Sequence, residues 1–235
     1  AGGAAGEKDA KGAGSTATIL NVGEDEGEIA IVAEVQGYKS QVKIKVVKPY
    51  VSKLELLDND SNLFPVYDHK QRDRTLPQWE FGQDGKPTQR HAAAVKFGTK
   101  LKARLHLKVK EKPSKPAKIV LAMATPPVAN TPPGAQSLVG PLPMYFFLPD
   151  DKQKSGFEWD GDESKGIDLE SKTPLPKFVR FYDWKLDVRM AGPGAIEKPA
   201  DFQKAEKLGT LDDVKIFAIW GKPAIGGGKL QDPGT

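Results

Sequence analysis

The sequence of 235 residues contains no cysteine, only three histidines and no long apolar run. The lack of cysteine excludes a disulfide scaffold, a thiolate metal site and a cysteine nucleophile within these residues. His69, His91 and His106 stand in no recognisable spacing with serine and aspartate, and no Gly-x-Ser-x-Gly turn occurs. We therefore expect no enzymatic activity from these residues. No apolar run reaches the roughly 20 residues that a membrane-spanning helix needs, so we also expect no membrane span.

Glycine and proline, by contrast, are abundant, with 24 and 19 residues. Both interrupt helices and supply turns, so this composition favours many short strands over long helices. The net charge is +4, from 35 basic and 31 acidic residues. Because both signs are plentiful, the small excess does not by itself indicate a polyanionic partner. We do not expect nucleic acid binding, because no aromatic residues alternate with the basic ones in residues 100–110, as base stacking would require.

Strict alternation of apolar and polar residues predicts strands in residues 28–47, 99–110 and 178–190. The first segment has Ile29, Ile31, Ala33 and Val35 on one face, followed by a glycine-containing loop. A second alternating run over residues 42–46 follows, which predicts a hairpin with one buried face. Residues 199–208 are the only predicted helix, because proline lies near the start and Gly209 follows the end.

Strand spacing and turn chemistry together predict an all-β protein, with immunoglobulin-like β-sandwich domains, long loops and at most one short helix. We expect a flexible N-terminal segment over residues 1–15 and a partial or small immunoglobulin-like β unit over residues 16–49. A larger β-sandwich domain with insertions is expected over residues 50–220, followed by a glycine-rich tail over residues 221–235.

The N-terminal strands resemble the last strands of a bacterial immunoglobulin-like (Big-type) domain. The likeness rests on Gly27, on the run Ile-Ala-Ile-Val-Ala-Glu-Val that follows Glu28, on the turn at residues 37–40 and on the closing run Val-Lys-Ile-Lys-Val-Val. It covers about 35 residues and implies a β-sandwich fold. Such a domain normally has several earlier strands. Two interpretations therefore stay open: the first domain is incomplete, or these strands extend the sheet of the next domain.

One strand carries a stripe of positive charge that is a candidate contact for a polyanion. Basic and histidine side chains alternate with apolar ones through the run Lys100, Lys102, Arg104, His106, Lys108 and Lys110. Extended, this stripe would be about 30 Å long. The alternative is a solvated face, or lysines that protect an edge strand from pairing with another chain.

Two acidic turns are candidate calcium sites, and no other cofactor is expected. Their oxygen ligands would come from Asp58, Asp60 and Asn62 in one turn and from Asp160 and Asp162 in the other. Both turns lack the glycine and the late glutamate of an EF-hand loop, so other loops would have to contribute ligands. The alternative is that both are solvated turns, because Asp and Asn favour turns.

Tryptophans that lie at loop edges are candidates for carbohydrate contact. Trp79 and Trp159 have this position in the sequence, whereas Trp184 and Trp220 lie in apolar strands where core packing is expected.

These patterns favour a non-catalytic β-sandwich module of a larger bacterial extracellular or secreted protein, which acts as a spacer, adhesion or recognition segment. The chain begins with Ala1 and shows no signal peptide, so we expect a processed product or an excised fragment. The expected partners are other domains of the same parent protein and a cell-surface polymer or protein.

Two alternative functions stay open. Residues 214–223 resemble the segment that precedes the catalytic part of bacterial transglutaminase-like proteins. That resemblance implies an accessory region of a secreted enzyme or effector whose catalytic domain lies outside this chain. The second alternative is a structural part of a phage-tail or injection assembly.

Overall fold

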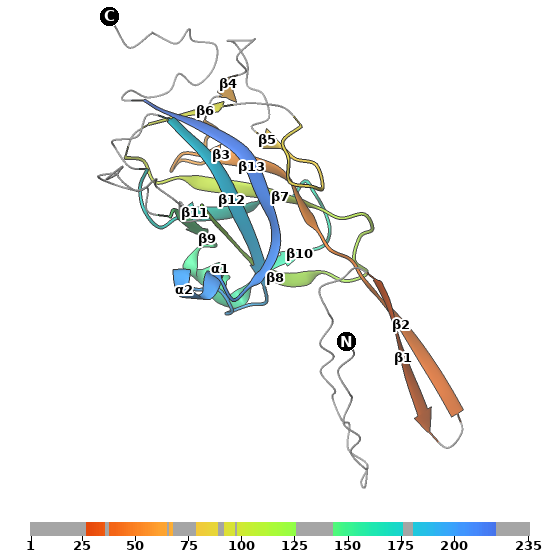
Figure 1. Cartoon of the computed structure of the whole chain (residues 1–235). Helices are drawn as coiled ribbons and strands as arrows, with labels where there is room; N and C mark the ends of the chain where they lie inside the picture. The colour runs from red at the N-terminus through yellow and green to blue at the C-terminus, as the bar shows by residue number, and fades with distance from the viewer. Residues whose placement is uncertain are drawn as a thin grey trace, which may run out of the picture. The chain divides into compact units, whose positions relative to one another are not determined.

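A computed structural model describes residues 27–35, 38–64, 66–67, 79–88, 92–96, 98–125, 143–175 and 181–219 (Figure 1). The chain divides into two compact units, with the boundary between Val46 and Val47. The predicted flexible N-terminal segment, the glycine-rich tail, His69, His91 and Trp220 all lie outside the described residues.

The first unit contains the predicted hairpin. Strands β1 (Gly27–Val35) and β2 (Tyr38–Val46) pair antiparallel, with Ile31 opposite Val42. The prediction of a buried face is wrong for the described residues, because Ile31 is 40% exposed and Val42 is 59% exposed. The opposite face carries ion pairs between Lys39 and Glu34 and between Lys43 and Glu28. Alternation therefore set the strands and their register, but within this unit none of the described residues covers the apolar face.

The second unit is built almost entirely of strands. They are β3 (Tyr50–Leu57), β4 (Val66–Tyr67), β5 (Trp79–Glu80), β6 (Ala92–Lys96), β7 (Lys102–Lys108), β8 (Ala117–Ala124), β9 (Tyr145–Phe147), β10 (Phe157–Trp159), β11 (Ile167–Ser171), β12 (Phe181–Ala191) and β13 (Glu206–Ile219). The all-β prediction is therefore confirmed for the described residues.

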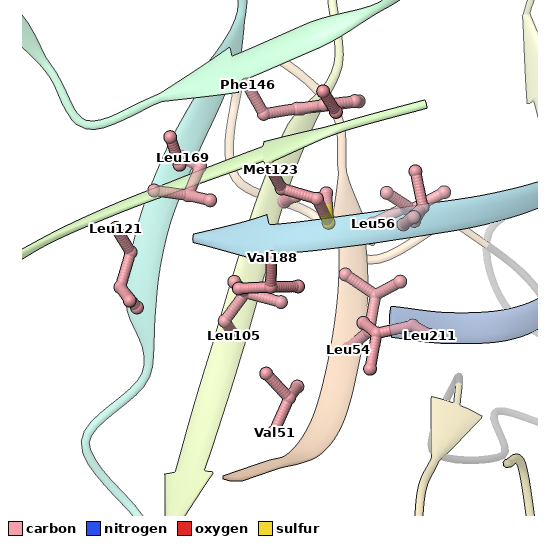
Figure 2. Close-up of a cluster of buried hydrophobic side chains, with 14 of the residues drawn as sticks. Val51, Leu54, Leu56, Leu105, Leu121, Met123, Phe146, Leu169, Val188 and Leu211 are labelled. Atoms are coloured by element: carbon pink, nitrogen blue, oxygen red, sulfur yellow. The ribbon is translucent and has the colours of Figure 1, made fainter. Parts of the chain in front are cut away.

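These strands form one sheet in the order β4-β6-β13-β12-β8-β9-β11-β7-β3-β5, with β10 paired to β8. The neighbours pair antiparallel except for β13 and β6, which run parallel. The sheet curls around a single hydrophobic core. Figure 2 shows side chains from both halves of the sheet in this core, including Leu54 of β3, Leu105 of β7, Val188 of β12 and Leu211 of β13.

The turn after β5, the last strand in this order, contacts strand β13 near the other end of the order. The amide of Asp212 donates a hydrogen bond to the carbonyl oxygen of Gly85 over 3.1 Å. Gly85 has a φ of +74°, and a Cβ atom there would lie 2.0 Å from the carbonyl oxygen of Thr210. Only glycine suits this position, because any side chain would be strained and would collide with backbone.

Alternation along β7 and β12 is confirmed by burial. Leu101, Ala103, Leu105 and Leu107 are all buried, whereas Lys102, Arg104 and His106 between them are half-buried. On β12, the alternate residues from Tyr182 to Val188 are buried in the same way. The apolar sides of these strands therefore face the same core.

The expectation of at most one short helix is wrong, because the described residues contain two. Helix α1 (Asp150–Ser155) follows Pro149, and α2 (Pro199–Phe202) is a single turn. The predicted helix over residues 199–208 ends early because Glu206 already begins β13, where it pairs with Met190 of β12. Sheet pairing here outweighs a helical pattern that only a proline and a glycine supported. No helix among the described residues is long and apolar enough to span a membrane.

Candidate functional site

The cationic stripe lies on the outer surface of the sheet but not at an edge. Strand β7 pairs with β11 on one side and with β3 on the other. The interpretation of the stripe as lysines that guard an edge strand is therefore wrong. We use the name "polar face" for the outward side chains of these three strands: Lys53, Glu55, Lys102, Arg104, His106, Lys108, Asp168 and Glu170.

Arg104 is held by a carboxylate directly across the sheet. Its Nε and Nη2 atoms donate to the two carboxylate oxygens of Asp168 over 2.6 and 2.9 Å. The hydrogen bond to Asp168 raises the pKa of Arg104. The stem of Arg104 also packs against Gly166, where a Cβ atom would lie 2.4 Å from the arginine Cδ. This two-point pairing fixes the orientation of the guanidinium, and the carboxylate of Asp168 compensates its positive charge.

His106 lies between two acceptors, and its side chain is only 12% exposed. Its Nδ1 lies 2.9 Å from the carbonyl oxygen of Glu163, and its Nε2 lies 3.4 Å from Oε2 of Glu55. Only the protonated imidazole can donate to both. The hydrogen bond to Glu55 accordingly raises the pKa of His106 above its usual 6.5. The same bond lowers the pKa of Glu55 from 4.5 to about 2, although burial of the carboxyl acts in the opposite direction.

The sequence did not identify the partners of Arg104 and His106, and Glu55 is the most buried of them. Among the described residues it is the one charged residue that is buried, and it also pairs with Lys53. A single glutamate inside the apolar strand Lys53-Leu54-Glu55-Leu56-Leu57 was the available signal. Its meaning required knowledge that β3 lies beside the cationic β7.

The lysines at the two ends of β7 are also engaged. Lys102 donates to the carbonyl oxygen of Asn59 over 3.0 Å, and Lys108 pairs with Glu163 at 3.4 Å. The cations of the polar face therefore have hydrogen-bond or ion-pair partners, and the face carries much less free positive charge than the alternation predicted. Contact with a polyanion stays a prediction, and Lys110 and Lys100 lie outside the strand itself.

A groove lies where β7 begins, with a cavity volume of about 580 Å³. Three segments distant in sequence form it: residues 100–102 before and at the start of β7, residues 148–151 at α1, and residues 170–172 at the end of β11. Asn59, from the turn after β3, completes the wall. Leu101 and Leu148 are buried residues of the core that form the apolar part of its lining.

The two predicted calcium turns do not converge. The first lies at the Lys102 end of β7, through Asn59, and the second at the Lys108 end, through Glu163. The span between them is about 20 Å at the usual strand rise. In the described chain, no group of three or more His, Cys, Asp or Glu side chains is placed to hold a metal ion. Calcium binding by Asp58, Asp60, Asn62, Asp160 and Asp162 stays a prediction.

The carboxylates of these turns stabilise the turns themselves. Asp58 accepts hydrogen bonds from the amides of Asp60 and Asn62 over 2.9 and 2.8 Å. Asp160 accepts from Lys165, which lowers its pKa, and Asp162 accepts from Ser164. This pattern is typical of turns in which Asp satisfies its own neighbouring backbone.

The tryptophans proposed for carbohydrate contact are core residues. Trp79 is fully buried and Trp159 is 4% exposed. Because a sugar must stack on an accessible ring face, the prediction of carbohydrate contact at these two residues is wrong. The exposed aromatic pair of the described chain is instead Phe181 and Phe217, which face each other across β12 and β13 with ring centroids 5.1 Å apart.

Comparison with known proteins gave no match: no family model, no curated protein and no solved structure is similar to this chain.

Proposed function

We propose that the chain is a non-catalytic module of a larger bacterial extracellular or secreted protein, and that its β1–β2 hairpin contacts a neighbouring domain. An immunoglobulin-like sandwich is part of this proposal, supported by the curled, mostly antiparallel sheet around one core. The paired state of Arg104, Glu55 and His106 favours a structural role for the most obvious charged cluster, which supports a non-catalytic function.

The observation that carries the proposal is the exposed apolar face of the hairpin. An isolated two-stranded sheet is at best marginally stable in water, and it needs a further strand, sheet or helix against its apolar face. Ile31 and Val42 pair at the centre of this face, and Tyr38, at the tip, is 83% exposed. Exposed apolar surface of this kind marks a contact with another protein.

The test begins with the parent reading frame and the domains that it encodes on either side of this chain. Each flanking domain is purified, and its binding to the full chain is measured by isothermal titration calorimetry. The variant Ile31→Lys with Val42→Lys places two charges on the apolar face. The control, Ala30→Lys with Val32→Lys, places the same two charges on the opposite face of β1.

We expect one flanking domain to bind the full chain, and the first variant to lose this binding while the control retains it. A parent frame without further domains would contradict the proposal, as would equal binding by both variants. Self-association of the wild-type chain in light scattering, lost in the first variant, would instead favour a structural part of an assembly.

A further inference from the structure

The groove at the start of β7 has a composition that does not suit a simple ion. Its walls carry three ammonium groups and three carboxylates: Lys100, Lys102, Lys172, Asp150, Asp151 and Glu170. These charges balance, so the groove as a whole attracts neither a free anion nor a free cation. Specificity must come from hydrogen bonds and shape.

Two of the lysines are already fixed by neighbours. Lys102 donates to the carbonyl oxygen of Asn59. Lys172 pairs with Asp150 over 3.2 Å and lies 5.6 Å from the centre of the Phe147 ring. Because these contacts restrain the side chains, part of the groove wall is preorganised before any ligand arrives.

The remaining charged groups are free to bind a ligand. Among the described residues, the charged groups of Lys100, Asp151 and Glu170 make no hydrogen bond or ion pair. Lys100 can only donate hydrogen bonds, whereas the two carboxylates can only accept them. A ligand that satisfies all three must therefore both donate and accept hydrogen bonds.

We propose that this groove binds a neutral saccharide. A sugar hydroxyl donates and accepts at the same time, so adjacent hydroxyls can satisfy Lys100 and Glu170 together. Pro149, which is half-buried at the start of α1, is the apolar residue of the lining that a sugar ring can reach, because Leu101 and Leu148 behind it are buried in the core. The volume of about 580 Å³ lies within the range of small-ligand sites. The groove contains no residue of the hairpin. A neutral saccharide would specify the cell-surface polymer that the proposed function expects as a partner.

Nuclear magnetic resonance on the ¹⁵N-labelled full chain tests the proposal. Three neutral disaccharides, N,N′-diacetylchitobiose, cellobiose and maltose, are titrated in the millimolar range. Glycylglycine, sodium phosphate and sodium acetate are titrated in parallel as zwitterionic and anionic probes. We expect saturable shifts with at least one disaccharide, clustered at residues 100–102 and 170–172.

Variants then connect the shifts to the groove. Lys100→Ser and Glu170→Gln should each weaken disaccharide binding about tenfold, which corresponds to the loss of one hydrogen bond to a charged group. Lys115→Ser, which removes an exposed lysine from the loop between β7 and β8, should leave it unchanged. Both substituted groove residues are exposed, and circular dichroism confirms that the variants fold.

The proposal is overturned if no disaccharide shifts the groove resonances, if only glycylglycine or an anion does, or if the groove variants bind as the wild type does. Failure here is distinguishable from failure of the proposed function, because the groove variants leave the hairpin intact and the hairpin variants leave the groove intact.

Discussion

The β1–β2 hairpin and the β3–β7 strand pair have the same kind of sequence and different surroundings. Both are antiparallel, and both place branched or long apolar residues opposite one another: Ile31 pairs with Val42, and Leu54 pairs with Leu105. Leu54 and Leu105 are fully buried, whereas Ile31 and Val42 are exposed. Alternation thus specifies strand, register and face, but burial requires a second layer that the alternating segment does not itself contain.

The charged faces of the two pairs differ as well. On the hairpin, Lys39–Glu34 and Lys43–Glu28 are exposed ion pairs. On the β3–β7 pair, Glu55 and His106 are largely withdrawn from water and share a hydrogen bond. Charges of the first kind contribute little to stability, whereas removal of one partner of the second kind leaves a buried group unsatisfied.

The largest difference is expected from truncation of paired apolar residues. Leu105→Ala should lower the free energy of unfolding by about 2–5 kcal/mol, because it leaves a cavity in a close-packed core. Ile31→Ala should change it by less than about 0.5 kcal/mol, because the side chain is already exposed. Urea unfolding of the full chain, followed by fluorescence of the buried tryptophans, measures both. Equal costs would show that the hairpin face is covered in solution.

The second prediction concerns the turn after β5, which is hydrogen-bonded to β13. Gly85→Ala should cost more than about 1 kcal/mol, because the positive φ and the carbonyl oxygen of Thr210 both oppose a side chain. Gly192→Ala is the matched control, since a Cβ atom there would meet nothing within 4 Å. The same urea experiment compares the two variants. A Gly85→Ala variant as stable as the control would contradict the tight approach of this turn to β13.

The third prediction is a pH dependence that belongs to the β3–β7 pair. Since the folded pKa of His106 is raised above 6.5, its contribution to stability is complete below pH 6.5 and is lost as the pH rises through the folded pKa. Since the folded pKa of Glu55 is about 2 and its ordinary value is 4.5, its contribution is present above pH 4.5 and is lost as the pH falls toward 2.

Urea midpoints measured across this pH range for the wild type and for His106→Gln test the prediction. The wild type should be the more stable below pH 6.5, and the difference should shrink as the pH rises. A difference that does not depend on pH would contradict a protonated His106 between Glu55 and Glu163. Lys39→Gln, which breaks an exposed pair of the hairpin, should show no such trend.

The smallest effects are expected from single ion pairs. Arg104→Ala should cost roughly 1 kcal/mol, because two hydrogen bonds to Asp168 are lost although both groups remain partly solvated. Lys43→Ala should cost at most about 0.5 kcal/mol, as exposed pairs usually do. Unfolding at low and at high salt separates the two, since only the exposed pair should be fully screened. Equal costs would mean that the two-point geometry of Arg104 adds nothing.

Some of the fold could be predicted because it depends on neighbours in the sequence. Alternation located the hairpin and strand β7, and it identified the core residues of β12 such as Trp184 and Leu186. Strand β13 was recognised only near its end. Gly209 and the irregular step at Asp212–Asp213 interrupt its pattern, and Asp213 has a φ of +61°. The short strands β4 and β5, of two residues each, carry no period at all.

The candidate site could be predicted only in part. Lys100 and Lys102 were identified from their alternation, but the groove also needs Glu170 and Asp151, which come from segments about 50 to 70 residues away. No local pattern contains that information. Glu55 was missed for the same reason, since its partner His106 lies 51 residues further along the chain.

The sequence by itself determined the alternating strands β1, β2, β7 and β12, which of their side chains share a face, and where turns rich in aspartate and glycine lie. These properties follow from backbone geometry and from the two-residue period of a strand. Only the tertiary structure decided that β7 lies inside the sheet, that Trp79 and Trp159 are buried, and that Arg104 and His106 are paired. The physical reason is that burial and charge pairing depend on which strands become neighbours, and here those neighbours are far apart in the sequence.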